Sequence, residues 1–299
     1  MTTLRHALRN VSVIAAALFV SAVSAQPTPL TQAQAAPPGA IKLTAEQESA
    51  LRRITEVQQV QLKPQYFYPS LGAGIPTGFG ANWGDIMIGA SGALSDKNRA
   101  EPDASMSLTA GLFDGSKYLG AEISANVLST RKFGANMGYD AKIHRMLYQG
   151  EEGFLSLAIG RNNFACSGTE ICSSTPNAYG IAPNTASNYM ALSGLTEIKL
   201  SEGKGLPLKA TIGVGNGYFA SNWQKNNVYN VFGDIGVQFH NQVGVSAGWS
   251  GVGVNANISA VPFPEWPVVV NLLFADIGNQ SPGGFNAILS VGVPLNFLK

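Results

Sequence analysis

Two histidines are the residues of this chain that would most readily support catalysis. Outside the first 25 residues they are His144 and His240. A hydrolase needs a histidine beside a serine nucleophile, with a third polar group to orient it. His144 has no His-x-Ser motif, the chain has no GxSxG motif, and His240 is expected in a tight turn. The sequence therefore predicts no catalytic residue, and a lipid hydrolase remains only the third candidate function.

Cys166 and Cys172 form the second chemically distinctive pair. Five residues separate them, in the run ACSGTEIC. A thioredoxin-like site would need two intervening residues, and a zinc site would need further ligands nearby. An exported protein meets oxidising conditions, under which such a pair forms a disulfide. We predict a loop disulfide, with unpaired thiols as the alternative, and the sequence indicates no metal or cofactor.

The first 25 residues have the features of a secretory signal peptide. Arg5 and Arg9 provide a positive start, residues 11–20 an apolar core, and residues 23–25 (VSA) a small-residue cleavage site. The apolar run is shorter than the roughly 20 residues of a spanning helix, which disfavours an uncleaved anchor. Cleavage after Ala25 leaves 17 basic and 18 acidic residues, so the exported chain is nearly neutral.

Residues 26–80 are predicted to form an N-terminal extension in the periplasm. Residues 26–40 are rich in Pro, Ala, Gln and Thr, as in a flexible tether. Thr44 and Gln47 have the spacing of a capping box, and apolar residues follow at helical spacing up to Val60. A short amphipathic helix is therefore expected near 44–60. It would pack on the rest of the protein, pair with other chains or touch a membrane surface.

From about residue 82 the apolar residues recur with period 2, which is typical of strands with one apolar face. In residues 118–127, for example, Leu119, Ile123 and Val127 share a face opposite Glu122 and Ser124. We count about twelve such strands, near 82–92, 104–113, 117–127, 140–149, 152–161, 188–200, 206–216, 228–239, 242–249, 251–260, 267–276 and 285–297.

The composition indicates what the apolar faces contact. Only 12% of the residues are charged, against about 25% in soluble domains. A helical membrane protein is excluded, because no run after residue 25 approaches about 18 apolar residues. A water-soluble β-sandwich would carry Lys, Glu and Thr on its solvent face, whereas here the second face is mostly Gly, Ser, Asn and Ala. Lipid-exposed sheets must close, since unpaired edges are costly there. The predicted fold is an all-β, antiparallel transmembrane barrel over 81–299.

Connection lengths agree with this fold. Links near 93–103, 128–139, 162–187, 217–227 and 277–284 are long, and they alternate with short ones, as outer loops alternate with periplasmic turns. Two links deviate: residues 249–251 should form an outer loop but are tight, and residues 261–267 should form an inner turn but are longer. An even strand number places both termini on the periplasmic side.

The C-terminus resembles the closing strand of Gram-negative outer-membrane β-barrel proteins. In that family a polar residue, a glycine and two apolar positions ending in an aromatic form a signal read by the barrel-assembly machinery. Here Ser290, Gly292, Leu295 and Phe297 match that order, although two residues follow the aromatic. Residues 74–85 (GIPTGFGANWGD) are also similar to uncharacterised cyanobacterial envelope proteins. The resemblance implies an outer-membrane location, contact with membrane lipid and assembly by that machinery.

The second face of the strands provides the functional prediction. By parity the charged residues expected to line the lumen are Glu122, Lys142, His144, Glu197, Lys199, Lys209 and Asp234. They would either line a water-filled pore or pair across a closed interior. The many inward glycines and serines favour open space. We therefore expect a non-enzymatic, porin-like barrel that forms a narrow, weakly selective channel for small solutes or ions. The alternative is a structural barrel whose outer loops bind a partner; nucleic acid is excluded by the absence of a basic excess.

Overall fold

The computed structural model describes residues 67–95, 103–131, 133, 137–168, 186–199, 205–220, 228–281 and 284–298. The predicted signal peptide and the helix predicted near 44–60 lie outside these residues. The chain divides into two compact units, Met1–Pro64 and Gln65–Lys299, and the second contains the barrel. The barrel unit thus begins earlier than the predicted boundary at residue 81.

Twelve strands account for nearly all regular structure in the described residues. They are β1 (Asp85–Ser95), β2 (Ala104–Phe113), β3 (Gly120–Val127), β4 (Met137–Gly150), β5 (Gly153–Ser167), β6 (Ser187–Lys199), β7 (Gly205–Gly215), β8 (Asn230–His240), β9 (Val243–Trp249), β10 (Val254–Ala260), β11 (Val269–Ala275) and β12 (Asn286–Asn296). A 3-10 turn, η1 (Gly217–Phe219), lies between β7 and β8.

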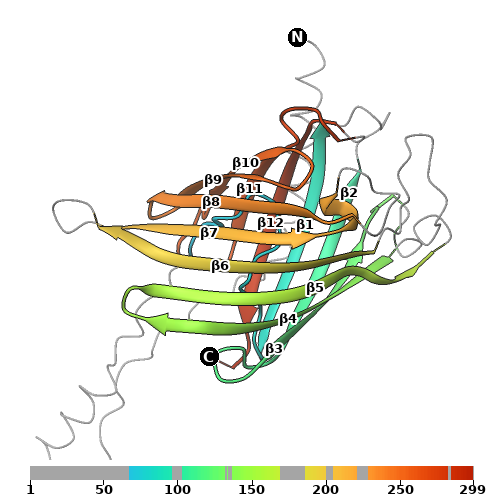
Figure 1. Cartoon of the computed structure of the whole chain (residues 1–299). Helices are drawn as coiled ribbons and strands as arrows, with labels where there is room; N and C mark the ends of the chain where they lie inside the picture. The colour runs from blue at the N-terminus through green and yellow to red at the C-terminus, as the bar shows by residue number, and fades with distance from the viewer. Residues whose placement is uncertain are drawn as a thin grey trace, which may run out of the picture. The chain divides into compact units, whose positions relative to one another are not determined.

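The strands form one closed antiparallel barrel in chain order, and β12 returns to pair with β1 (Figure 1). At this junction Asp85 lies opposite Asn296 and Gly89 opposite Gly292, so β1 begins at the end where β12 finishes. Closure gives every strand two neighbours, which removes the unpaired edges that lipid would not tolerate. The predicted all-β barrel of about twelve strands is confirmed.

One strand differs clearly from its predicted span. β5 continues to Ser167, whereas the alternation ends near residue 161. The pairing with β4 shifts register between Tyr139 and Ala141, and Asn163 has a φ of 51°. Its backbone N–H donates to Asp140 Oδ1 at 2.7 Å. A bulge adds a residue and interrupts period 2, so the sequence pattern placed the start of this loop too early.

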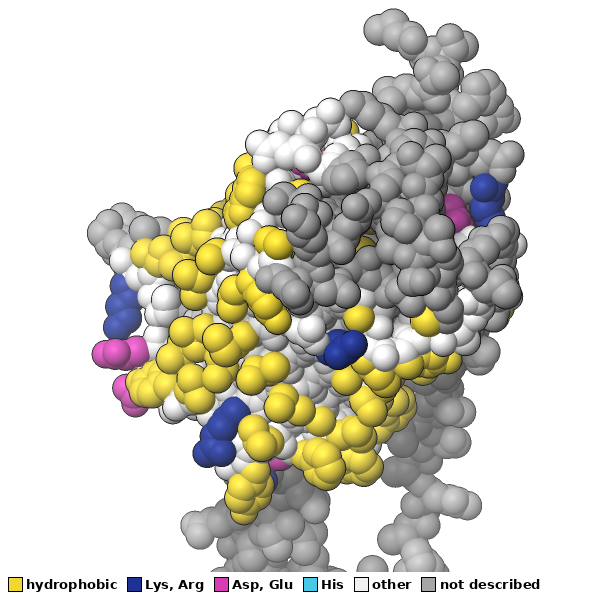
Figure 2. Space-filling model, turned by 45° about the vertical axis from the view of Figure 1, so that its right-hand side comes forward, with side chains coloured by type: hydrophobic (Ala, Val, Ile, Leu, Met, Phe, Trp, Pro, Cys, Tyr) yellow, Lys and Arg dark blue, Asp and Glu magenta, His cyan; other side chains and the backbone are white. Residues whose placement is uncertain are grey.

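The outer face of the barrel is apolar. Ile143, Ile159, Ile212 and Ile235 each expose between 50% and 60% of their surface. Figure 2 shows hydrophobic side chains covering much of the described wall, with few charged ones among them. An apolar outer band of this kind is typical of a barrel wall that contacts hydrocarbon. In the part of the chain that the structure describes, no helix is long and apolar enough to span a membrane.

Exposed aromatic side chains gather at the end of the barrel where the shorter connections lie. These are Tyr118, Tyr148, Phe239, Phe263 and Trp266. Aromatic rings favour the boundary between hydrocarbon and water, where membrane barrels carry aromatic girdles. This ring of side chains therefore marks one edge of the lipid-facing band.

The lipid-facing wall leads to a first testable prediction. Ile235 lies at the middle of β8 and faces outward, so Ile235→Arg should lower the free energy of unfolding by about 2–4 kcal/mol, as lipid-facing charges do near the midplane. Ser91→Arg, on the inner face of β1, is the control and should cost much less. Urea unfolding in lipid vesicles, followed by tryptophan fluorescence, measures both. Equal losses for the two variants would contradict the assigned faces.

The two connections of unexpected length both contact features inside the barrel. The tight turn after β9 has Gly251 at a φ of 94°, where a Cβ would collide with the Phe219 carbonyl oxygen. The longer link after β10 bonds to the chain entering the lumen, because Phe67 N–H donates to the Pro264 carbonyl at 3.1 Å. The deviations in length thus reflect what occupies the lumen.

Candidate functional site in the barrel lumen

Residues 67–82, which we call the inner segment, run through the lumen before β1 begins. Three bonds tie its first part to β10. Ser70 N–H donates to Ser259 Oγ at 2.7 Å, and the side-chain amides of Asn255 and Asn257 donate to the carbonyls of residues 73 and 72 at 3.0 and 3.1 Å. Residues 255, 257 and 259 alternate along β10 and so share one face, which is therefore the face that lines the lumen.

The middle of the inner segment crosses to β8, β6 and β5. Ala73 N–H donates to Asp234 Oδ2 at 2.9 Å. Gly78 is held from two sides, because its N–H donates to Ser193 Oγ at 2.8 Å and its carbonyl accepts from Ser156 Oγ at 2.7 Å. Ser193 and Ser156 are at most 1% exposed. These hydroxyls therefore bind backbone rather than water.

The last part of the inner segment binds to β4 and β3. Ala81 N–H donates to Glu122 Oε2 at 2.9 Å, and Lys142 Nζ donates to the Phe79 carbonyl at 3.1 Å. His144 Nε2 lies 3.0 Å from the Ala81 carbonyl. A carbonyl only accepts, so this nitrogen carries the proton. These bonds join the inner segment to six strands between β10 and β3, and Asn82 N–H donates to Asp85 at the start of β1.

Four of the predicted pore-lining charges form two ion pairs beside this segment. Lys142 Nζ is 3.0 Å from Glu122 Oε1, and Lys209 Nζ is 3.3 Å from Asp234 Oδ1. The Asp234 side chain is fully buried. Because each pair has one residue of each sign, it adds little net field to the lumen. These residues point inward as predicted, but their partners are each other and the inner segment.

The other three predicted lining residues have different environments. His144 is 4% exposed, and glycines pack on its imidazole; a Cβ at Gly115 would lie 2.5 Å from its Nδ1. Glu197 and Lys199 are exposed at the end of β6. They sit at the rim of the barrel rather than along its wall. Neither His144 nor His240, whose Nδ1 accepts from Gln242 N–H at 3.2 Å, bonds to a serine in these contacts.

The interpretation of inward glycines as open space is wrong at several positions. A Cβ at Gly236 would meet the Leu71 carbonyl oxygen, and a Cβ at Gly111 would meet that of Asn82. Both glycines allow the backbone of the inner segment to approach the wall closely. The small inward residues are therefore in part the imprint of this segment.

Aromatic side chains fill the lumen near η1. Phe219 contacts Tyr189 edge-on, with ring centroids 5.8 Å apart, and lies 4.9 Å from the ring of Phe232. Ile75 of the inner segment packs against this cluster. Burial raises the pKa of the neighbouring Tyr218 phenol, which accepts a hydrogen bond from Asn163 Nδ2 at 3.3 Å. The chain after β7 therefore folds inward at this end.

The lumen is filled unevenly. Met87 lies opposite Thr109, and the Thr109 hydroxyl is 2.8 Å from that of Ser124. Ser124 is two residues from the inward Glu122, so all of these side chains share the inner face. The Met87 side chain is nevertheless 49% exposed, whereas inward-facing Phe232 is 0% exposed. The lumen is thus closed beside β8 and open beside β1. Sequence reasoning missed this division, because parity gives only the face of a residue.

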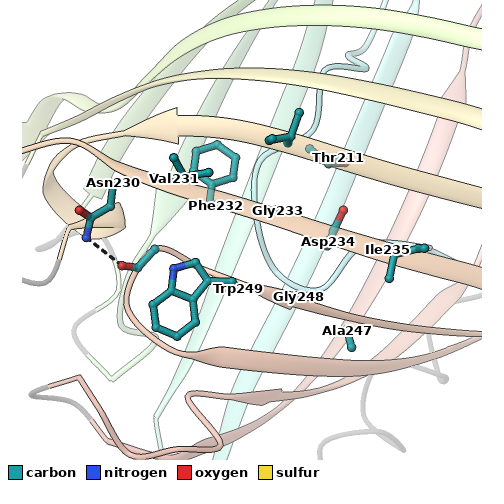
Figure 3. Close-up of a pocket in the computed structure, with 12 residues that line it drawn as sticks. Thr211, Asn230, Val231, Phe232, Gly233, Asp234, Ile235, Ala247, Gly248 and Trp249 are labelled. Carbon is teal, nitrogen blue, oxygen red and sulfur yellow. Dashed lines mark hydrogen bonds between the residues drawn. The ribbon is translucent and has the colours of Figure 1, made fainter.

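A hollow with a volume of about 690 Å³ lies against β7, β8 and β9 (Figure 3). Its lining includes the outward-facing Ile212, Val231 and Ile235, together with Trp249, and Gly233 lies among them without a side chain. On the inner face of the same strand are Phe232 and Asp234. These two inward residues and Thr211 also belong to the lining, so the hollow borders residues of both faces of the wall.

Two predicted features remain untested, and the first of them, the disulfide, falls partly outside the described residues. Cys166 belongs to the last part of β5, but Cys172 lies between residues 169 and 185, so their pairing stays a prediction. The assembly signal also stays a prediction. Its residues Ser290 and Gly292 face inward, while Leu295 and Phe297 follow the outward parity, and Phe297 is 67% exposed.

No protein-family model matches the chain, and no curated protein matches its sequence. Solved structures with a similar barrel include Omp33 of Acinetobacter baumannii, at 11% identity, 73% coverage of this chain and a TM-score of 0.38. Another is the COG4313 outer membrane channel of Pseudomonas putida F1, at 7% identity, 76% coverage and a TM-score of 0.42. A bacterial polysaccharide outer membrane secretin matches at 10% identity, 73% coverage and a TM-score of 0.37. In each of the three comparisons, the match extends over the full length of the solved chain. By its own closed twelve-strand wall with an apolar exterior, this chain has the architecture of an outer-membrane-type β-barrel.

Proposed function

We propose that this barrel is a narrow, weakly selective channel for small solutes or ions. The observation that carries the proposal is the open part of the lumen, where an inward methionine, Met87, remains half exposed. A barrel filled only for stability would bury such a side chain, because burying it is worth about 1.5–3 kcal/mol. Open space beside a polar wall allows water to enter.

Two further features support narrowness and weak selectivity. The inner segment occupies part of a twelve-strand lumen, which is already smaller than that of wide porins with 16–18 strands. Within each of the pairs Glu122–Lys142 and Lys209–Asp234, the two charges neutralise each other. Strong selectivity needs a ring of like charges, and these paired charges do not provide one.

Planar bilayer recording tests this function directly. The exported chain, refolded in detergent and checked by its heat-dependent shift on SDS gels, should give discrete, small conductance steps. In a KCl gradient the reversal potential should lie close to zero, because paired charges exclude neither ion. A folded barrel that gives no conductance would contradict the channel, and a strongly displaced reversal potential would contradict weak selectivity.

A further inference from the structure

We propose that solutes cross along one side of the lumen, over the inner faces of β11, β12, β1 and β2, and that this route takes small uncharged solutes. The inference rests on the proposed channel function and specifies its path and substrate class. The four strands are consecutive around the barrel, so their inner faces form one continuous surface. We call this surface the open sector.

The inner segment leaves the open sector largely uncovered. Apart from Asn82 N–H, which donates to Asp85 at the start of β1, its hydrogen bonds to inward side chains go to β10, β8, β6, β5, β4 and β3. It reaches the open sector at the margins, where Gly74 lies against Leu273 of β11 and Asn82 approaches Gly111 of β2. The segment therefore lies against the opposite wall.

Exposure separates the two walls. Ser156, Ser193 and Ser259 face inward on the covered wall and are at most 1% exposed. On the open sector, inward residues of the same size, such as Ser91 and Ser290, remain partly exposed. A Cβ built on Gly292, beside Ser290, meets no atom within 4 Å. Free volume therefore reaches the wall at β12.

The open sector is lined by uncharged groups apart from one carboxylate. Its inward residues are Val269, Asn271, Leu273 and Ala275 on β11; Asn286, Ile288, Ser290, Gly292, Pro294 and Asn296 on β12; Asp85, Met87, Gly89, Ser91 and Ala93 on β1; and Ser105, Ser107, Thr109 and Gly111 on β2. Asp85 lies at one end, where it accepts from Asn82 N–H at 2.8 Å and Asn296 Nδ2 at 2.6 Å. The route itself thus offers hydroxyls, amides and apolar surface.

This chemistry favours uncharged solutes over ions. An ion that loses hydration water in a narrow passage needs opposite charge or several strong dipoles in return. The charged pairs Glu122–Lys142 and Lys209–Asp234 lie on β3, β4, β7 and β8, outside the open sector. A polyol or similar neutral solute can exchange water for serine and threonine hydroxyls, and its carbon skeleton can contact Met87 and Ile288.

Solute uptake by proteoliposomes tests the substrate class. The probes are ribitol, glutamate and lysine, which are similar in size but neutral, anionic and cationic. The full exported chain should admit ribitol faster than either charged probe. Equal or faster uptake of glutamate or lysine would overturn the proposed class while leaving a channel intact. No passage of any probe and no ion conductance would instead overturn the channel function itself.

A blocking variant tests the route. Gly292→Trp places an indole in the free volume of the open sector and should abolish most of the ribitol uptake. Val293→Trp, on the same strand but facing lipid, is the matched control and should leave uptake unchanged. Refolding in detergent avoids any effect on cellular assembly, and the gel shift reports folding. Uptake by folded Gly292→Trp at the rate of the unchanged chain would overturn the route.

A charge variant provides an independent readout. Met87→Lys adds a cation to the open sector, so the reversal potential in a KCl gradient should shift toward anion preference. Met87→Leu keeps the site neutral and should leave the reversal potential unchanged. An unshifted potential in Met87→Lys would show that permeating ions do not pass this wall, and would overturn the proposed path.

Discussion

Removing residues 26–81 should raise the single-channel conductance several-fold, because residues 67–81 occupy part of the lumen cross-section. The inward serines and asparagines that bind this segment can bind water instead, so the barrel is expected to keep its wall. Asn82 is retained, since its carbonyl accepts from Asp85 N–H at 2.9 Å at the start of β1. Recording in planar bilayers gives the conductance, and the heat-dependent gel shift confirms that the shortened barrel has folded.

A second deletion separates the inner segment from the residues that precede it. Removing residues 26–64 deletes only the unit before the barrel and leaves the inner segment in place. Its conductance should match that of the full exported chain. If both deletions raised conductance equally, residues 26–64 would be the obstruction. A folded barrel without residues 26–81 that conducts no better than the full chain would refute the obstructing role of the segment.

Asp234→Ala should destabilise the barrel more than any other single substitution at the inner segment. Asp234 is the fully buried acceptor of Ala73 N–H and the partner of Lys209. Its removal leaves a buried ammonium group unpaired, a change that typically costs about 3–5 kcal/mol. Urea unfolding in vesicles measures the loss, and hydrogen exchange at the Ala73 amide should accelerate because that N–H has lost its acceptor.

Two comparisons make the result specific to a buried pair. The double variant Asp234→Leu with Lys209→Met removes both charges, and should recover much of the stability because apolar pairs often replace buried ion pairs without loss. Glu122→Ala should cost less, since the side chains of the Glu122–Lys142 pair retain 17% and 11% exposure. Equal losses in Asp234→Ala and the double variant would mean that the unpaired lysine is not the cause.

Period-2 alternation was sufficient to predict the wall of this protein. In β3, Glu122 and Ser124 face inward and Ile123 faces outward, as parity requires. Since a strand side chain has only two faces to choose from, a local pattern decides the face. The pattern failed where a bulge changed the count, as in β5 around Asn163, and where two links had to accommodate structure inside the barrel.

The contents of the lumen were beyond such local reasoning. The inner segment has no regular period and is rich in glycine, with glycines at 72, 74, 78 and 80. Together with small inward residues such as Gly236, this run was the available signal. Its partners are distant in sequence: Ser70 and Ser259 are separated by 189 positions, and Ala73 and Asp234 by 161. No spacing rule connects residues that far apart.

The sequence by itself determined a closed, lipid-facing barrel of about twelve strands and the inward face of the charged residues that form the two ion pairs. These properties follow from short-range alternation and from the need to satisfy every backbone group in lipid. Tertiary structure alone decided what the inward residues do: Glu122, His144 and Asp234 hold a crossing segment, while Met87 and Gly292 border free space. The physical reason is that the hydrogen-bond partner of an inward side chain, and the space around it, depend on which distant backbone segment lies beside it. The low charge content of the sequence is the same for a wall that binds backbone and for a wall that borders water.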